Sequence, residues 1–224
     1  MSEQPVIAVK DLVKRYGEVE AVRGIDLEVQ PGEIFGFLGP NGAGKSTTIN
    51  ILCTLVEMTS GTARVAGFDV EREPDAVRGR IGLVFQDPSL DQQLTARENL
   101  EFHAFIYDVP AAIRKQRINE VLEMVELTDR ADSVVMTFSG GMRRRLEIAR
   151  GMLHTPQVLF LDEPTIGLDP QTRRHIWGYL GELPKQHGVT IFMTTHYMDE
   201  AEYCDRIAII DHGQVQAVGT PDEL

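Results

Sequence analysis

The sequence predicts an α/β protein with a β-rich N-terminal part, an α/β core and a mostly helical insertion. Three observations carry this prediction. Short apolar runs typical of buried strands recur in both halves of the chain, one of them leads through a glycine-rich loop into a helical pattern, and residues 87–155 carry mainly helical patterns. We therefore treat residues 1–224 as a single domain, in which residues 1–86 and 156–224 form the β subdomain and core and residues 87–155 a helical subdomain.

Composition narrows the class of protein. The chain is 42% hydrophobic and 7% aromatic, as in ordinary soluble globular proteins. It has neither an apolar run long enough to span a bilayer nor a basic start followed by an apolar stretch, so we expect a cytoplasmic protein. A net charge of −12 argues against a nucleic-acid partner. Cys53 and Cys204 stand in apolar segments without metal-ligand spacing, and we expect both to be reduced, packed thiols.

Strands are expected wherever β-branched or apolar runs end in turn residues. Residues 6–17 are rich in β-branched side chains. After the glycine-rich loop, residues 46–55 place Ile49, Leu52 and Leu55 at helical spacing, so strand, loop and helix follow one another. In chain order the expected strands are 6–17, 25–29, 34–39, two within 63–70, 81–86, 158–162, 190–195, 207–211 and 214–218.

Three helices are expected in the insertion. Thr95 and Glu98 form a capping box, in which the hydroxyl accepts a backbone N–H and the carboxylate reaches back to the start of the helix. A second helix covers about residues 112–126, and Ser139 opens a third, basic helix. The apolar faces expected to pack inward are Leu100, Phe102, Phe105 and Ile106 on the first helix, and Ile113, Ile118, Val121, Leu122 and Val125 on the second.

The glycine-rich loop has the phosphate-binding P-loop pattern. Glycine lets the backbone approach an anion, so that successive N–H groups point inward, and the following helix adds its positive N-terminus. A plain glycine turn would explain the glycines, but not a lysine and a serine in these places. Lys45 supplies charge to the β- and γ-phosphates of a nucleotide, and Ser46 offers its hydroxyl to Mg²⁺. The residues of the loop are Gly39, Pro40, Asn41, Gly42, Ala43, Gly44, Lys45, Ser46 and Thr47.

A second motif follows in VLFLDEP, residues 158–164, where four apolar residues precede two carboxylates. A buried strand ending at Asp162 places this carboxylate at the carboxyl edge of the sheet beside the P-loop, where it can orient a magnesium ion. Glu163 then faces a water in line with the γ-phosphate. Two charges at the end of a strand are common by themselves and need have no function. Together with a P-loop, a role in the nucleotide site is the favoured interpretation.

Between these motifs lies FSGGMRRRLEIARGML, and the order of all three resembles the ATPase subunits of ABC transporters. The resemblance covers Tyr16 to Leu224, and FLGPNGAGKST, LDEPTIGLDP and TTHYMDEAEYCDRIAIID are most similar to ATPases of bacterial drug exporters of the ABC-2 class. It implies a P-loop NTPase core of the RecA-like type, with an N-terminal antiparallel β subdomain and an inserted helical subdomain. It also implies ATP hydrolysis to ADP and phosphate, with ATP and Mg²⁺ as ligands.

The resemblance assigns roles to four further side chains. Tyr16 stacks on adenine, unless it is a core tyrosine at a strand end. Gln86 reaches the metal and the attacking water, unless it is an exposed polar residue at a strand end. Asp169 belongs to a loop that crosses a dimer interface, or is a turn aspartate. His196 bonds the γ-phosphate, and with Lys45, Gln86 and Glu163 it completes the expected catalytic set.

Ser139, Gly140 and Gly141 match the family's signature sequence. A serine and bare amides at a helix N-terminus form an anion site, although the same residues can simply cap the helix. The resemblance implies that they meet the γ-phosphate held by another copy, in a head-to-tail homodimer that ATP closes. Where the family commonly has glutamine this chain has Met142, which removes one amide beside that nucleotide.

The expected partner is a separate membrane permease that docks near Gln86 to Thr95, which places the ATPase on the cytoplasmic face of the membrane. Export of drugs or lipids is the favoured direction. Import of a small nutrient uses the same catalytic residues and stays open, whereas a ribosome- or DNA-acting ATPase is disfavoured by the single cassette and the acidic charge. Similar exporters often continue past GTPDEL, so this chain is either naturally short or a shortened form.

Overall fold

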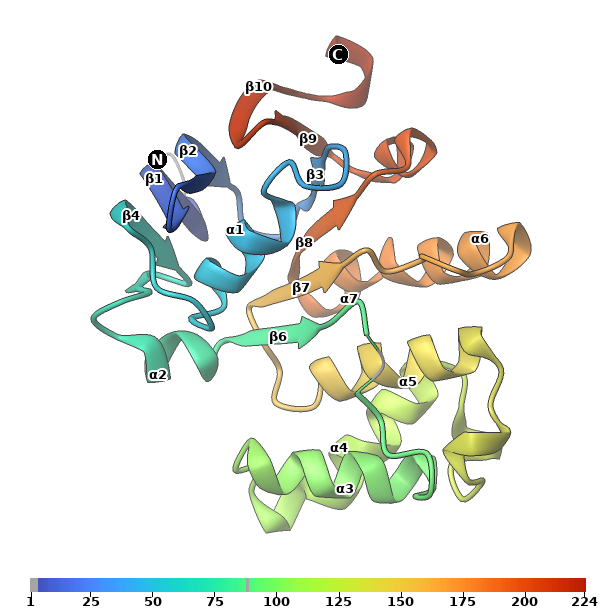
Figure 1. Ribbon diagram of the computed structural model, residues 1–224. Coiled ribbons are helices and arrows are strands. Elements are labelled where there is room, and N and C mark those ends of the chain that lie inside the picture. Colours follow the sequence, from blue (N-terminus) through green and yellow to red (C-terminus); the bar gives the residue numbers. More distant parts are fainter. Residues whose placement is uncertain (1–3, 88) are drawn as a thin grey trace.

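The computed structural model describes residues 4–87 and 89–224 and contains two sheets with helix α1 (Lys45–Leu52) between them (Figure 1). An antiparallel sheet has the order β2-β1-β4-β5 and a larger sheet the order β10-β9-β3-β8-β7-β6. The expected strands are all present. They are β1 (Ile7–Tyr16), β2 (Val19–Val29), β3 (Ile34–Leu38), β4 (Ser60–Val65), β5 (Phe68–Asp69), β6 (Ile81–Val84), β7 (Val158–Asp162), β8 (Thr190–Thr195), β9 (Arg206–Asp211) and β10 (Gln214–Gly219).

The central strands of the larger sheet, β3, β8 and β7, are buried on both faces and are therefore rich in apolar residues, whereas the edge strand β10 is partly exposed. Strands β9, β3, β8, β7 and β6 are parallel, and β10 closes one edge in the antiparallel sense. Because side chains alternate along a strand, Phe35 and Phe160 pack toward α1 and the antiparallel sheet, while Leu38 and Leu161 pack toward the helices of the other face. Both cysteines are buried and free, as predicted.

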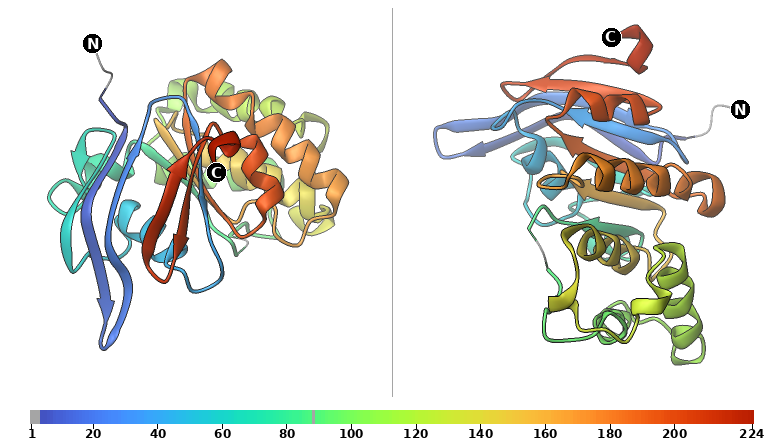
Figure 2. Two further views of the ribbon diagram at one scale, coloured as in Figure 1. Left: turned by 90° about the horizontal axis from the view of Figure 1, so that it is seen from above. Right: turned by 90° about the vertical axis from the view of Figure 1, so that its right-hand side faces the viewer.

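The insertion carries α3 (Ala96–Ile106), α4 (Ala111–Met124) and α5 (Gly140–Gly151), with 3₁₀ turns η1 (Thr128–Arg130) and η2 (Val135–Thr137) before α5. The view from the side separates these helices from the antiparallel sheet (Figure 2). Within the described residues, no helix has the length and apolar character needed to cross a bilayer. The three expected helices are confirmed, and the capping box of Thr95 and Glu98 is complete.

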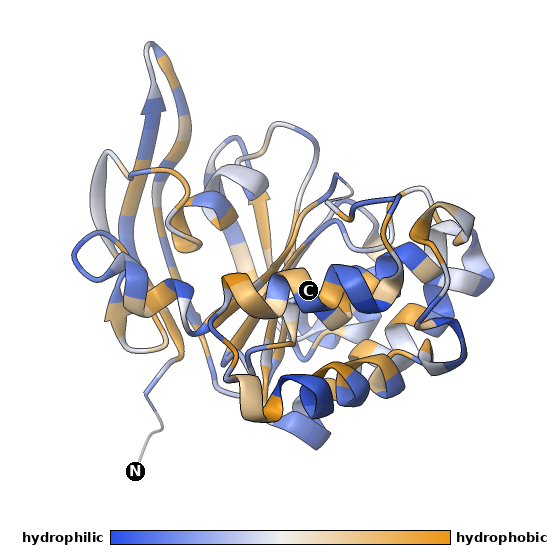
Figure 3. Ribbon diagram, turned by 90° about the horizontal axis from the view of Figure 1, so that it is seen from below, coloured by the Kyte–Doolittle hydropathy of each residue, from blue (hydrophilic) through white to orange (hydrophobic). Residues whose placement is uncertain are grey.

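The apolar face expected on α3 is wrong in part. Leu100 is buried, but Phe102, Phe105 and Ile106 are exposed. Ala96, Leu100 and Ala104 form the buried stripe, because small side chains four residues apart let α3 approach α4 and α5 closely. Ile113 of α4 is likewise exposed rather than packed inward, and blue and orange segments alternate along the helices of this region (Figure 3). Leu55, expected in the helix after the glycine-rich loop, lies beyond the end of α1 at Leu52 and is exposed.

Four elements were not predicted from the sequence: α2 (Pro74–Arg78), α6 (Pro170–Leu180), α7 (Leu183–His187) and the 3₁₀ turn η3 (Met198–Tyr203). A final turn, η4 (Pro221–Glu223), ends the chain. One buried cluster joins α3, α4 and α5 to a face of the larger sheet without interruption. The division at residues 87 and 155 therefore stays a prediction.

Candidate functional site

The carboxyl ends of the central strands bring three loops together. Leu38, the last residue of β3, lies opposite Thr195 of β8 and Ile209 of β9. Asp162, the last residue of β7, lies opposite Thr194. In a parallel sheet with this strand order, ligands bind where loops leave the carboxyl edge. The loops after β3, β7 and β8 thus meet at one edge of the sheet.

Glycine is required at two positions of the P-loop. A side chain on Gly39 would place its Cβ 2.2 Å from the carbonyl oxygen of Ile210. Gly44, the residue before α1, has φ 108° and a Cβ there would lie 2.6 Å from the carbonyl oxygen of Ala21. These close backbone approaches curl the loop around the N-terminus of α1, whose free N–H groups and positive dipole end favour an anion.

Lys45 is held inside the loop. Its ammonium Nζ donates to the carbonyl oxygens of Gly39 at 2.8 Å and Pro40 at 3.1 Å, and lies 3.6 Å from Oε1 of Glu163. Both charged side chains are buried. The lysine is thus paired with protein oxygens in this structure, and a bound phosphate would exchange these contacts for its own oxygens.

A cavity of about 510 Å³ opens beside this lysine. Tyr16 stands at its rim and is half exposed, so the alternative of a core tyrosine is wrong. Gln86 reaches the cavity from the loop after β6. Ala21 and Ile166 also line it, although nothing in their residue types signals a binding role. The full lining is Tyr16, Ala21, Asn41, Gly42, Gly44, Lys45, Ser46, Thr47, Gln86, Glu163 and Ile166.

Ser46 lines this cavity, and the carboxylate of Asp162 lies beside Ser46 without lining the cavity itself. The Ser46 hydroxyl Oγ lies 3.4 Å from Oδ1 of Asp162. The hydroxyl of Thr194 donates to the same carboxylate oxygen and accepts the backbone N–H of Glu163 at 3.1 Å. A hydroxyl and a carboxylate suit Mg²⁺, which prefers oxygen ligands and takes the remainder from phosphates and water. Thr194 was not singled out from the sequence, because a strand threonine carries no signal of this positioning role.

Glu163 is set at a sharp backbone turn. Its φ is 46°, a left-handed conformation that costs about 1–3 kcal/mol for a residue with a side chain and often marks functional sites. Nδ1 of His196 lies 3.1 Å from Oε1 of Glu163. The carboxylate is therefore held between His196 and Lys45 at the mouth of the P-loop.

The signature residues lie elsewhere. The Ser139 hydroxyl caps α5 by accepting the N–H of Met142 at 3.2 Å, and neither Ser139 nor Gly140 lines the cavity beside Lys45. Both are exposed. The structure thus gives Ser139 the capping role that was the alternative.

Asp169 also caps a helix. Its carboxylate accepts the N–H groups of Gln171 and Thr172 at 3.0 Å each, at the start of α6. A Cβ on Gly141 would lie 2.5 Å from Cγ2 of Thr172, so the N-termini of α5 and α6 are in direct contact. Asp169 and the signature residues therefore share one surface, apart from the cavity beside Lys45.

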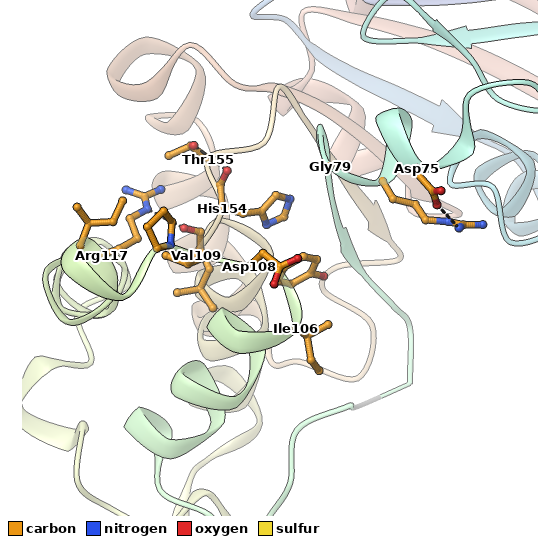
Figure 4. A pocket seen from close by; sticks show the side chains of 13 residues that line it. Asp75, Gly79, Ile106, Asp108, Val109, Arg117, His154 and Thr155 are labelled. Atoms are coloured by element: carbon orange, nitrogen blue, oxygen red, sulfur yellow. Dashed lines mark hydrogen bonds and ion pairs between the residues drawn. The ribbon is translucent and has the colours of Figure 1, made fainter.

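A second cavity of about 650 Å³ lies between α2 and the end of α3 (Figure 4). Its lining includes Asp75, Ile106, Asp108 and His154, and His154 stacks on Tyr107 with ring centroids 4.2 Å apart. None of the predicted site residues borders it. The P-loop residues all lie away from it, so the cavity beside Lys45 is the better candidate site.

Comparisons with known proteins agree with this geometry. The family model described as ABC transporter matches residues 22–166. The chain is 48% identical to the daunorubicin/doxorubicin resistance ATP-binding protein DrrA of Streptomyces peucetius, over 100% of this chain and 68% of that protein. It is 44% identical to the linearmycin resistance ATP-binding protein LnrL of Bacillus subtilis, over 98% and 70% respectively.

Solved structures are similar throughout. The cbiO1 protein of Clostridium perfringens, part of the ABC transporter complex cbiONQ, superposes with a TM-score of 0.92 at 31% identity, covering 99% of this chain and 90% of that one. The dimeric ATP-binding cassette MJ0796, bound to ADP and phosphate, gives a TM-score of 0.84 at 31% identity, covering 96% and 98%. With a P-loop cavity and relatives that match the whole of this chain, the chain belongs to the ABC transporter family and is an ATP-binding subunit with ATPase activity.

Proposed function

We propose that two copies of this chain pack head to tail and close on ATP, each nucleotide held by the P-loop of one copy and the signature residues of the other. The observation that carries the proposal is the position of Ser139 and Gly140. They stand exposed at the N-terminus of α5, outside their own chain's P-loop cavity. A dimeric relative bound to ADP and phosphate supports the pairing. An isolated copy therefore has two half-sites for phosphate, one at its P-loop and one at the N-terminus of α5.

We infer the roles in hydrolysis from the contacts around the cavity. Lys45 neutralises the β- and γ-phosphates after it leaves Glu163 and the loop carbonyls. Ser46 and Asp162 would hold Mg²⁺, which when bound neutralises charge on the phosphate oxygens. Glu163 orients the attacking water and accepts its proton, while His196 fixes the carboxylate and reaches the γ-phosphate. Tyr16 would stack on the adenine, and Gln86 would help to hold the metal and the water.

The proposed transport reaction is export of drug-like or lipid-like compounds through a separate permease at the cytoplasmic face of the membrane. The names of relatives that confer daunorubicin or linearmycin resistance support this direction. The permease is proposed to dock at residues 86–95, which lead into α3, a helix that also exposes Phe102 and Ile106. Pro88, inside this segment, lies outside the described residues. The acidic net charge of −12 gives no support for a nucleic-acid partner.

Trapping the closed dimer tests the proposal. Glu163→Gln removes the proton acceptor but leaves the P-loop intact, so the variant should dimerise with ATP and Mg²⁺ in light scattering. Adding Gly140→Asp should restore monomers, because a carboxylate at the α5 N-terminus repels phosphate while it suits the helix dipole and leaves the fold intact. A Glu163→Gln variant that stays monomeric with ATP, or that dimerises equally with Gly140→Asp, would contradict the head-to-tail site.

A further inference from the structure

Helix α5 buries three charged side chains that take no part in the cavity beside Lys45. Arg144, Glu147 and Arg150 are 7%, 3% and 4% exposed. We call them the buried charge cluster. Burial lowers the pKa of Arg144, and the neighbouring carboxylate of Glu147 opposes this shift. A charge is retained in a protein interior only where several hydrogen bonds offset the loss of water.

Arg144 makes those bonds to the backbone on both sides of the catalytic glutamate. Its guanidinium donates from Nε to the carbonyl oxygen of Pro164 at 2.7 Å and from Nη2 to that of Asp162 at 3.1 Å. A third bond runs from Nη1 to the carbonyl oxygen of Phe85 at 2.6 Å. Pro164 and Asp162 flank Glu163, and Phe85 directly precedes Gln86. A single planar group thus ties together the two loops that carry the candidate hydrolytic side chains.

The other two members hold the far side of the Gln86 loop. Oε2 of Glu147 accepts from Nη1 of Arg144 at 3.0 Å, and Oε1 accepts the backbone N–H of Ser89 at 3.0 Å. Nη1 of Arg150 donates to the Ser89 hydroxyl at 2.5 Å. The loop around Gln86 is therefore held at Phe85 and at Ser89 by side chains of a single helix. That helix is capped by Ser139, the proposed contact for the other copy's phosphate.

We propose that Arg144 is a positioning residue for ATP hydrolysis, which sets Glu163 and Gln86 in register with each other through the three carbonyl oxygens it binds. This inference rests on the proposed function, since it needs Glu163 and Gln86 to act on one water. A guanidinium suits this role, because its donors are spread over three nitrogens in a fixed plane, whereas a lysine ammonium groups its three donors on one atom. The cluster also gives α5 a direct connection from the signature end to the hydrolytic loops.

Steady-state kinetics of Arg144→Gln tests the role. We expect kcat to fall at least about tenfold, whereas the Kd for a fluorescent ATP analogue, which reports the P-loop, stays within about twofold. Arg144→Lys keeps the charge with fewer correctly directed donors, so its kcat should lie between those of Arg144→Gln and the unchanged chain. In a Glu163→Gln background, Arg144→Gln should cause no further loss of the residual turnover, because both changes act on the same group.

Arg117→Gln is the matched control. Arg117 also donates to two backbone carbonyl oxygens, of Leu153 and Met152, and pairs with Glu120, but at the other end of α5. The kcat of Arg117→Gln should stay within about twofold of that of the unchanged chain, even if its melting temperature falls as far as that of Arg144→Gln. If Arg144→Gln does not fold, Arg144→Lys is tested in its place: its kcat should fall while its Kd for the ATP analogue stays nearly unchanged.

Several outcomes would overturn the inference. The first is an unchanged kcat in Arg144→Gln or, if that variant is unfolded, in Arg144→Lys. The second is a loss of kcat in Arg117→Gln equal to that in Arg144→Gln. The third is a double variant of Arg144→Gln and Glu163→Gln whose loss of kcat is the full product of the two single losses. Failure of the proposed function looks different, because the unchanged chain would then neither hydrolyse ATP nor dimerise. An active unchanged chain with an equally active Arg144→Gln variant refutes only the positioning role.

Discussion

The contact between strand β6 and helix α5 offers a sharp test of the packing. A Cβ on Gly82 of β6 would lie 2.3 Å from the carbonyl oxygen of Gly151 and 2.9 Å from Cδ1 of Leu159. The backbones of α5 and β6 therefore touch, and this closeness is what allows the side chains of α5 to reach the loop after β6. We predict that Gly82→Ala destabilises the protein.

The magnitude follows from which atom blocks the methyl group. Overpacking a tight core costs about 1–3 kcal/mol where neighbouring side chains can shift. At Gly82 the nearest atom is a backbone carbonyl at the end of a helix, so we expect the upper part of that range, about 3 kcal/mol. For a chain of this size each 1 kcal/mol lowers the melting temperature by about 2–4 °C, which corresponds to about 6–12 °C.

Urea unfolding and thermal melting measure this change, and Gly178→Ala provides the control. Gly178 lies inside α6, and a Cβ there meets no atom within 4 Å. Alanine should therefore stabilise the helix by about 0.5–1 kcal/mol through propensity alone. The same substitution thus has opposite expected signs at the two sites. A Gly82→Ala variant that melts within about 2 °C of the unchanged chain would refute the close approach of α5 to β6.

Two further predictions concern the helical region. Burial lowers the pKa of His103 from 6.5 to about 4, so between these pH values the unfolded chain binds a proton that the folded chain does not. The free energy of unfolding should therefore decrease as pH falls from about 6.5 to about 4, and it should decrease less in His103→Gln. If urea unfolding gives the same decrease for both chains across this pH range, the prediction is wrong. Thr95→Ala should lower the free energy of unfolding in urea by about 1 kcal/mol, because it removes the capping hydroxyl. Thr95→Ser keeps a hydroxyl and should retain most of the stability, so equal losses in the two variants would exclude the cap.

Much of the fold could be read from local patterns. The buried strands β3 and β7 are largely apolar runs, β8 has an apolar centre flanked by threonines, and the cap of α3 is encoded by Thr95 and Glu98. Short elements such as α2 and α7, with five residues each, could not be found this way, because they hold too few residues to show a period. Phe102 and Phe105 were placed wrongly for a related reason: periodicity gives a face of a helix, but the neighbouring helices decide which face is covered.

The candidate site divides in the same way. The P-loop, Asp162 and Glu163 could be predicted from the sequence, because their chemistry requires particular residue types at fixed spacing. Thr194 and Arg144 do not, since a threonine in a strand and an arginine in a basic helix are ordinary. They acquire their roles only from the atoms that lie against them.

By itself, the sequence determined that this chain folds as an α/β protein around a phosphate-binding loop, because glycines, a lysine and strand-end carboxylates are local requirements of that chemistry. Tertiary structure alone decided that Glu163 lies between Lys45 and His196, and that the exposed Ser139 stands away from its own chain's cavity. The physical reason is that distances between residues far apart in the chain depend on strand order and helix packing, which no short stretch of sequence encodes.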